Sequence, residues 1–211
     1  MRRNPVSSAM ETLKQLLRWL VHLLGLGPDI ERLEWFAGLA QKIEPRASFE
    51  VLALPESEKL ILKEISRRAR DSRSEGGSGT IVLFSGTSSG KADAAEAVAK
   101  DLQQDLYRVD SSRVVSKYIG ETEKHLSRLF KGAASAGAIL FFDEADALFG
   151  KRSEIEDSHD RYTNSETNYL LQLFERSKGL AILAANIEET APPEFLRRFH
   201  FVVNFHQPSH S

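Results

Sequence analysis

Short apolar runs alternate with longer amphipathic segments from residue 80 onward. Apolar runs with β-branched residues are typical of strands buried on both faces, and the segments between them have helical spacing. Strands that alternate with helices favour an α/β fold, in which a parallel sheet carries helices on both faces. We expect strands at residues 80–85, 105–110, 138–143, 180–186 and 201–205, and helices at residues 91–103, 121–134 and 163–176.

The pattern before residue 48 predicts a helical N-terminal extension, residues 1–47, ahead of a domain over residues 48–211. Leucines at helical spacing predict an amphipathic helix over residues 1–27, and residues 29–42 carry a second helical pattern. The first helix is too short and too polar to span a bilayer. We expect it to pack on its own domain or on a neighbouring subunit, with docking on a partner or a membrane surface as the alternative. A short strand or turn, a proline and a third helix are expected over residues 49–73.

Composition and charge narrow this picture only slightly. Of the 211 residues, 41% are hydrophobic and 27% are charged, which is the balance of a globular domain. The formal net charge of −2 provides no overall positive field that would favour a nucleic-acid partner. Because the chain has no cysteine, a disulfide framework and a cysteine-ligated metal site are excluded.

A glycine-rich turn lies between the first expected strand and the helix that follows, in "LFSGTSSGKADAAEAVAK". The full phosphate-binding pattern is a glycine, four residues and then Gly-Lys-Ser/Thr. Here only three residues separate the two glycines, and an alanine follows the lysine. Backbone N–H groups at the helix N-terminus and the lysine charge still suit a phosphate, although an ordinary strand–turn–helix is the alternative. The candidate binding residues are Gly86, Thr87, Ser88, Ser89, Gly90, Lys91, Ala92 and Asp93.

Two carboxylates follow the apolar strand "ILFF", where unpaired charges are costly. In phosphoryl transfer such a pair has a use: Asp143 would hold Mg²⁺, directly or through water, and Glu144 would polarise the attacking water. The alternative is a pair of acids that cap a helix.

Three further segments carry candidate polar groups. Asn186 ends the apolar run "LAILAAN". Its amide would orient the attacking water or touch the γ-phosphate; the alternative is an ordinary turn residue. Arg197 and Arg198 precede the last expected strand. They would either neutralise transition-state charge in a neighbouring subunit or belong to a solvated face.

The segment "SKYIGETEKHL" has an aromatic residue beside a glycine in a loop before a helix. Lys117, Tyr118, Ile119 and Gly120 suit a hinged loop that grips an extended polypeptide. The alternative is an ordinary helix start, with Thr122 as the candidate cap.

In this order, the motifs resemble those of the AAA+ ATPases, in particular the AAA type in the narrow sense. "SKYIGETEKHLSRLF" is similar to the first pore loop, "ILFFDEADALFGKR" to the Walker B segment, "LAILAAN" to sensor 1 and "PEFLRRFHF" to the arginine-finger region. The segment "FEVLALPESEKLILKEI" resembles the part whose apolar residues contact adenine. The resemblance covers residues 48–208, and "GKRSEIEDSHDRYTNSETNYLLQ" is most like bacterial AAA proteins, including those of contractile injection systems.

The resemblance implies a P-loop sheet of strand order 5-1-4-3-2, with ATP or ADP and Mg²⁺ as cofactors. It implies Mg²⁺-dependent ATP hydrolysis coupled to protein remodelling or translocation in a ring, expected to be a hexamer in the cytoplasm. The implied roles are Lys91 at the β- and γ-phosphates, Asp143 at the metal, Glu144 as base, Asn186 as sensor, Arg197 and Arg198 across the ring interface, and Tyr118 on a threaded protein substrate.

Two features depart from the family pattern, and the first of them, in the phosphate loop, favours a rival interpretation. The phosphate loop is one residue short and lacks the Ser/Thr hydroxyl at Ala92, which would be a magnesium ligand. The chain also stops at "FHQPSHS", where the family continues into a helical lid; truncation and a natural reduced member both remain open. The rival is a catalytically impaired subunit that serves nucleotide binding or assembly.

Overall fold

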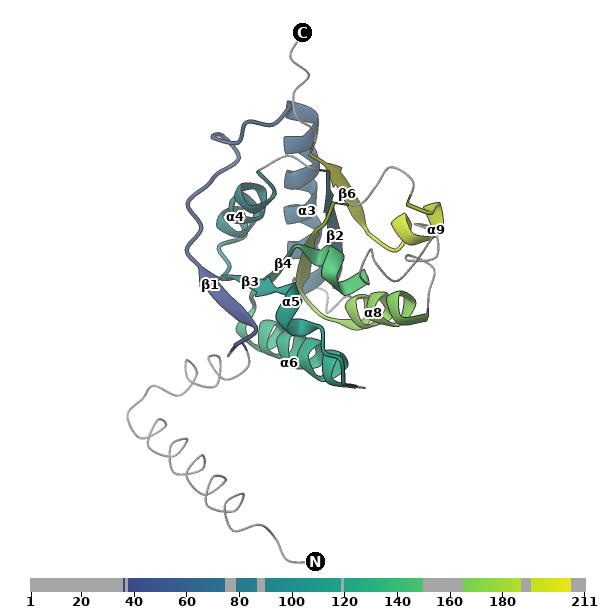
Figure 1. Ribbon diagram of the computed structural model, residues 1–211. Helices are drawn as coiled ribbons and strands as arrows, with labels where there is room; N and C mark the ends of the chain where they lie inside the picture. The colour runs from purple at the N-terminus through teal and green to yellow at the C-terminus, as the bar shows by residue number, and fades with distance from the viewer. Residues whose placement is uncertain are drawn as a thin grey trace, which may run out of the picture.

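The computed structural model describes residue 36 and residues 38–74, 79–86, 90–118, 120–149, 165–186 and 191–205. A six-stranded sheet forms the centre of this described part (Figure 1), in the spatial order β1-β3-β4-β5-β2-β6. The strands are β1 (Ala40–Ile43), β2 (Thr80–Ser85), β3 (Leu106–Asp110), β4 (Ile139–Asp143), β5 (Leu180–Ala184) and β6 (Phe201–Asn204).

The five strands from β2 to β6 pair only in parallel with one another. Numbered among themselves in chain order, they lie in the order 5-1-4-3-2. The predicted α/β fold, its strand order and each of the five predicted strands are therefore confirmed.

The edge strand β1 was not predicted. Residues 29–42 were expected to be helical, but residues 40–43 pair antiparallel with β3, from Ala40 opposite Val109 to Ile43 opposite Leu106. Phe36 stacks on Tyr107 with ring centroids 3.8 Å apart, so tertiary contacts outweigh the local helical pattern here. This strand belongs to the sheet although it lies before the expected boundary at residue 48.

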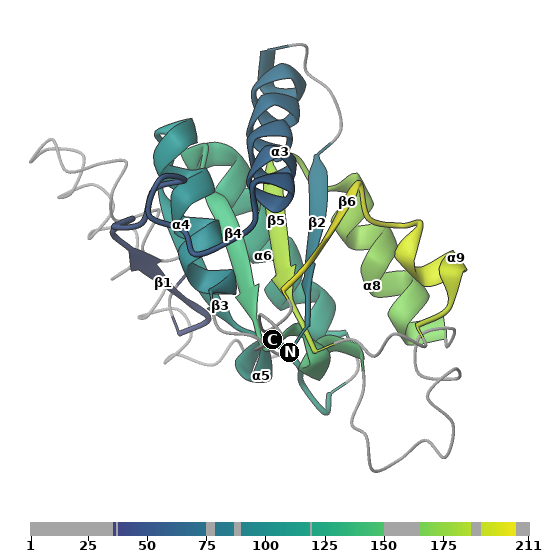
Figure 2. The same cartoon turned by 90° about the horizontal axis from the view of Figure 1, so that it is seen from above.

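Two helices cover each face of the sheet (Figure 2). Helices α3 (Glu56–Ser74) and α4 (Lys91–Leu102) lie on one face, and α6 (Glu121–Ala136) and α8 (Ser165–Arg176) lie on the other. All four were predicted; the expected first residues of α8, 163–164, and the expected helix over residues 1–27 lie outside the described residues. Three short helices were not predicted: α5 (Ser111–Val114), the 3-10 helix η1 (Ala145–Phe149) and α9 (Pro193–Leu196).

Alternate side chains of each strand supply two separate cores. In β2, Val82 and Phe84 pack toward α3 and α4, whereas Ile81 and Leu83 pack toward α6 and α8. On the second face Phe174 lies 5.0 Å, centroid to centroid, from both Phe130 and Phe142. Burial on both faces is what a central parallel strand requires. None of the helices in this part of the chain combines the length and the apolar character needed to cross a bilayer.

Gly86 is confined by the end of the last strand. Its φ is +99°, and a Cβ atom added there would lie 2.3 Å from the carbonyl oxygen of Phe205. That segment is fixed in place, because the N–H of Phe205 donates to the carbonyl of Ser85 at 2.8 Å. Only glycine therefore fits the first position of the turn after β2.

We predict that Gly86→Ala lowers the free energy of unfolding by about 3 kcal/mol, since it adds a backbone clash to left-handed strain. The matched control is Gly38→Ala, where φ is +75° but nothing lies within 4 Å of the added Cβ. That variant should lose only about 1 kcal/mol. Urea unfolding followed by circular dichroism measures both, and equal losses would contradict the proposed clash.

Candidate active site

The candidate site lies at the carboxyl ends of β2, β5 and β4, which are neighbours in the sheet. Helix α4 begins with Lys91 after β2, Asn186 follows β5, and Asp143 ends β4. Parallel strands present their carboxyl ends at one edge, so residues far apart in the chain meet there. A hydrogen bond joins Lys91 directly to Asn186.

The turn before α4 suits an anion. Gly90 is the N-cap residue of α4 with a φ of 113°, and no side chain caps this helix start. The backbone N–H groups of a first helical turn form a positive end that binds phosphate. Ala92 and Asp93 are exposed in that turn, while Thr87, Ser88 and Ser89 lie outside the described residues.

The Lys91 ammonium points at the end of β5. Its Nζ donates to Oδ1 of Asn186 at 2.9 Å and to the carbonyl of Ala185 at 3.1 Å. Partial burial lowers the pKa of Lys91, and the negative charges of Asp146 and Asp143 oppose that shift. The ammonium is thus bonded to the end of β5, and the charges of two acids favour its protonated form.

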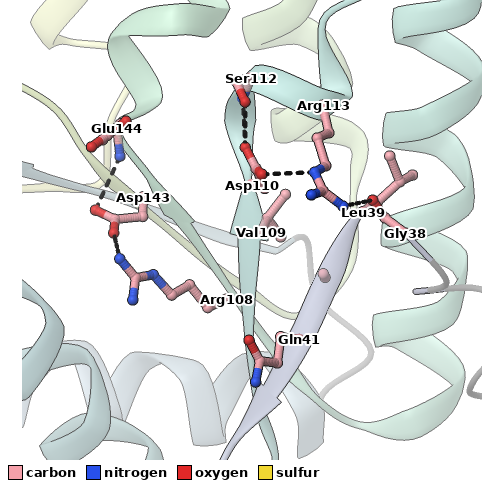
Figure 3. A pocket seen from close by; sticks show the side chains of 11 residues that line it. Gly38, Leu39, Gln41, Arg108, Val109, Asp110, Ser112, Arg113, Asp143 and Glu144 are labelled. Carbon is pink, nitrogen blue, oxygen red and sulfur yellow. Dashed lines mark hydrogen bonds and ion pairs between the residues drawn. The ribbon is translucent and has the colours of Figure 1, made fainter.

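The two predicted acids have different surroundings (Figure 3). Asp143 is partly buried; its Oδ1 accepts the N–H of Glu144 at 3.0 Å, and its Oδ2 is ion-paired with Arg108. Glu144 is exposed and has a φ of 49°, a left-handed conformation that is uncommon for a residue with a side chain. Both acids line a cavity of about 530 Å³, together with residues of β1, β3 and α5.

Two residues of this site were not predicted from the sequence. Asp146 accepts the N–H of Asn186 on both carboxylate oxygens, at 3.0 and 3.1 Å. Arg108 reaches Asp143 from the neighbouring strand β3. The signal for Asp146 was a third acid three positions after Asp143; Arg108 is an exposed charge within an otherwise buried part of β3.

The two predicted arginines differ although they are adjacent. Arg198 is ion-paired with Glu175, which raises the pKa of its guanidinium, and it donates to Oδ1 of Asn168 at 3.4 Å. Arg197 is exposed, and within the described residues its side chain has no hydrogen bond or ion pair. No hydrogen bond among those residues joins either arginine to Lys91.

The predicted substrate loop lies between α5 and α6. Lys117 is exposed and Tyr118 is 74% exposed, while Ile119 lies outside the described residues. Gly120, with a φ of 77°, is the N-cap residue of α6. The alternative in which Thr122 caps the helix is wrong, because its hydroxyl accepts the N–H of Ser116 at 3.0 Å, ahead of the helix.

Residues 81–207 match the family model described as "ATPase family associated with various cellular activities (AAA)". This match spans more than half of the chain, so the chain belongs to the AAA family. It is an AAA-type ATPase domain, and the cofactors of that family are ATP or ADP and Mg²⁺.

The chain is similar to several AAA proteins. It is 31% identical over 191 residues to an uncharacterized AAA family ATPase, y4kL, of Sinorhizobium fredii, covering 87% of this chain and 57% of the relative. It is 34% identical over 120 residues to the cell division cycle protein 48 homolog of Archaeoglobus fulgidus, covering 56% of this chain and 16% of that protein. The chain thus spans just over half of the first relative and a small part of the second.

A solved structure has the same fold. It is the HORMA:CdnC:Trip13 complex of E. coli MS115-1, in which one chain matches with a TM-score of 0.54 and 16% sequence identity. The match covers 81% of this chain and 70% of that chain, and it shows the fold alone.

The described residues fit these cofactors. Glycines at positive φ, an uncapped helix start and a lysine suit the phosphates of a nucleotide. No cluster of three or more acidic, histidine or cysteine side chains within the described ranges forms a metal cage. Mg²⁺ needs no such cage, because it usually keeps several waters and binds one or two carboxylates together with the phosphates. Asp143 has its carboxylate at the end of β4, at the same edge of the sheet.

The different surroundings of the two arginines lead to a stability prediction. Arg198→Ala should lower the free energy of unfolding by about 1 kcal/mol, because it leaves Glu175 without its partly buried partner. Arg197→Ala, the matched control, should change it by less than about 0.5 kcal/mol. Thermal and urea unfolding measure both values; a larger loss for Arg197→Ala would show that this residue is the one held within the subunit.

Proposed function

We propose that the protein hydrolyses ATP in a Mg²⁺-dependent reaction and uses it to remodel or translocate a protein substrate in a ring oligomer. The observation that carries this proposal is the meeting of Lys91, Asn186 and the Asp143–Glu144 pair at one edge of the sheet. An ordinary strand–turn–helix has no need for a cation, an amide and two acids at that edge. Phosphoryl transfer uses all of them.

Each residue has a role in this proposal. The N–H groups after Gly86 and Gly90 bind the phosphates, and Lys91 exchanges its contacts with β5 for the β- and γ-phosphates. Asp143 holds the hydrated Mg²⁺, which neutralises developing charge on the phosphates. Glu144 accepts the proton of the attacking water, and its exposure leaves room for that water. Asn186 orients the water or the γ-phosphate.

Arg197 and Arg198 are the basis for proposing a ring. They lie between α9 and β6, and β6 pairs with β2 on the side opposite β5. The guanidinium of Arg197, which is exposed and has no partner in the described part of the chain, is available to the phosphates of a neighbouring subunit. Arg198 would have to leave Glu175 to act in the same way. We propose a hexamer in the cytoplasm, with the protein substrate threaded past Tyr118 and with no nucleic-acid partner.

We also retain the proposed division of the chain into an N-terminal extension, residues 1–47, and the large ATPase subdomain, residues 48–211. In this proposal the first helix packs on its own domain or on a neighbouring subunit, with docking on a partner or a membrane surface as the alternative. The pairing of β1 with β3 means that the last residues of the extension are part of the ATPase sheet.

A second candidate function is nucleotide binding or assembly without turnover. The ion pair between Arg108 and Asp143 favours it, because the guanidinium occupies the carboxylate that would hold the metal. Ala92 adds to this, since it cannot offer a hydroxyl to Mg²⁺. Phosphate release by the assembled protein separates the two candidates.

We predict that Glu144→Gln keeps nucleotide binding and loses hydrolysis by about a hundred-fold or more, because the amide preserves shape but accepts no proton. Calorimetry with ATP, with and without Mg²⁺, and phosphate release measure the two properties. The comparison variant Asp143→Asn should instead make ATP binding less dependent on Mg²⁺. Equal turnover by wild type and Glu144→Gln would refute the assigned base, and no turnover by the wild type would favour the second candidate.

We predict that Tyr118→Ala spares basal ATP turnover but abolishes its stimulation by an unfolded protein, because the side chain is exposed on the loop between α5 and α6 and has no role at the nucleotide in this proposal. The matched control is Tyr169→Ala on α8, where the tyrosine is 46% exposed. Turnover is measured with and without an unfolded substrate. If an unfolded protein still stimulates turnover in Tyr118→Ala, this loop is not the site that contacts the protein substrate.

A further inference from the structure

The end of β5 has a donor that the sheet does not satisfy. The N–H of Ala185 donates to the carbonyl of Phe84 on β2 at 3.0 Å. In a strand the next N–H points the opposite way, so the N–H of Asn186 faces the β4 side. The ladder between β4 and β5 ends with Phe142 opposite Leu183, so β4 offers no partner at the level of Asn186.

Asp146 takes the place of that missing strand residue. The chain leaves the line of β4 at Glu144, whose φ is 49°, and the N–H of Ala147 closes the turn onto the carbonyl of Glu144 at 3.1 Å. This turn starts η1 and brings Asp146 back to the end of β5. Both carboxylate oxygens of Asp146 accept the N–H of Asn186, at 3.1 and 3.0 Å.

The side chain of Asn186 continues the chain of contacts to α4. An ammonium group only donates, so the amide oxygen of Asn186, not its nitrogen, must face Lys91. Lys91 also bonds the carbonyl of Ala185, which fixes its position relative to the same strand end. These contacts connect η1, the end of β5 and the start of α4, which are far apart in the sequence, through Asp146, Asn186 and Lys91.

We propose that Asp146 is a positioning residue, which holds the backbone of Asn186 so that the amide oxygen of Asn186 is aimed at the Lys91 ammonium. It acts through these two residues and has no contact of its own with the phosphates. The hydrogen bonds from the N–H of Asn186 to Asp146 are independent of any reaction. The effect of Asp146 on turnover rests on the proposed ATP hydrolysis.

A second effect of Asp146 is electrostatic. Burial lowers the pKa of Lys91. The negative charges of Asp146 and Asp143 oppose this shift, and Asp146 has the larger effect of the two. Asn at position 146 would keep a hydrogen-bond acceptor for Asn186 but remove this charge. Leu would keep the side-chain volume but remove the hydrogen-bond acceptor and the charge. Ala would remove the side-chain volume as well.

The first measurement is amide hydrogen exchange of Asn186 in the nucleotide-free protein, followed by NMR. Exchange should be at least about ten-fold faster in Asp146→Ala, which corresponds to about 1.4 kcal/mol and is modest for a hydrogen bond to a charged group. Asp146→Asn should restore most of the protection. Asp71→Ala, which removes an exposed acid on α3, is the control and should leave Asn186 unchanged. Asp146→Leu replaces Asp146→Ala if the smaller side chain prevents folding.

The second measurement separates positioning from general support of the fold. If Asp146 acts through Asn186, then Asp146→Ala should lower kcat in the wild type but add no further loss in Asn186→Ala. Losses that multiply in the double variant would overturn the proposal, as would unchanged exchange of Asn186 in Asp146→Ala and Asp146→Leu. If the wild type shows no turnover, the proposed hydrolysis fails by itself, and the exchange results still decide the role of Asp146.

Discussion

Backbone hydrogen bonds of the parallel ladder align Phe142 of β4 with Leu183 of β5, and Leu183 with Leu83 of β2. Since the three strands run in the same direction and stay in register, the residues that follow them emerge at one edge of the sheet. The glycine turn, the acid pair and Asn186 owe their proximity to this alignment. The close approach of Phe205 to Gly86 extends it to β6. A shift of register in any one strand would separate groups that no local contact could bring back together.

The parts of this arrangement that sequence predicts are those with a local signal. The run from Thr80 to Ser85 is buried on both faces, and such a run has few alternatives to a central strand. Strand β1 escaped prediction because it has two exposed and two half-buried residues and its partner lies on β3, far along the chain. Asp146 escaped prediction because its partner, Asn186, lies 40 residues away. Its meaning depends on a turn at Glu144 that sequence does not indicate.

The arginine pair shows the same limit at single-residue scale. Arg197 and Arg198 are indistinguishable by type and position in the motif, but the end of α9 directs them differently. One meets Glu175 on α8 and the other meets solvent. Residues 163–176 were predicted as a helix, but the partner of Arg198 on that helix, Glu175, follows only from how α8 packs beside α9. Secondary structure was thus predictable here, while the pairing of charges between elements was not.

The contacts of Lys91 bear on what a nucleotide must do to enter. In the free protein this partly buried ammonium already has two oxygen acceptors, one from the backbone and one from Asn186. Phosphate binding is therefore a competition between oxygens for one cation, and the net affinity is the difference between two comparable interactions. The exchange adds the same free-energy cost to the binding of every anion, so it lowers all affinities by one factor and leaves their ratios unchanged. The resting contacts of Lys91 therefore raise the concentration at which any anion fills the site, and a ligand with several negative oxygens has the most interaction energy to offset that cost.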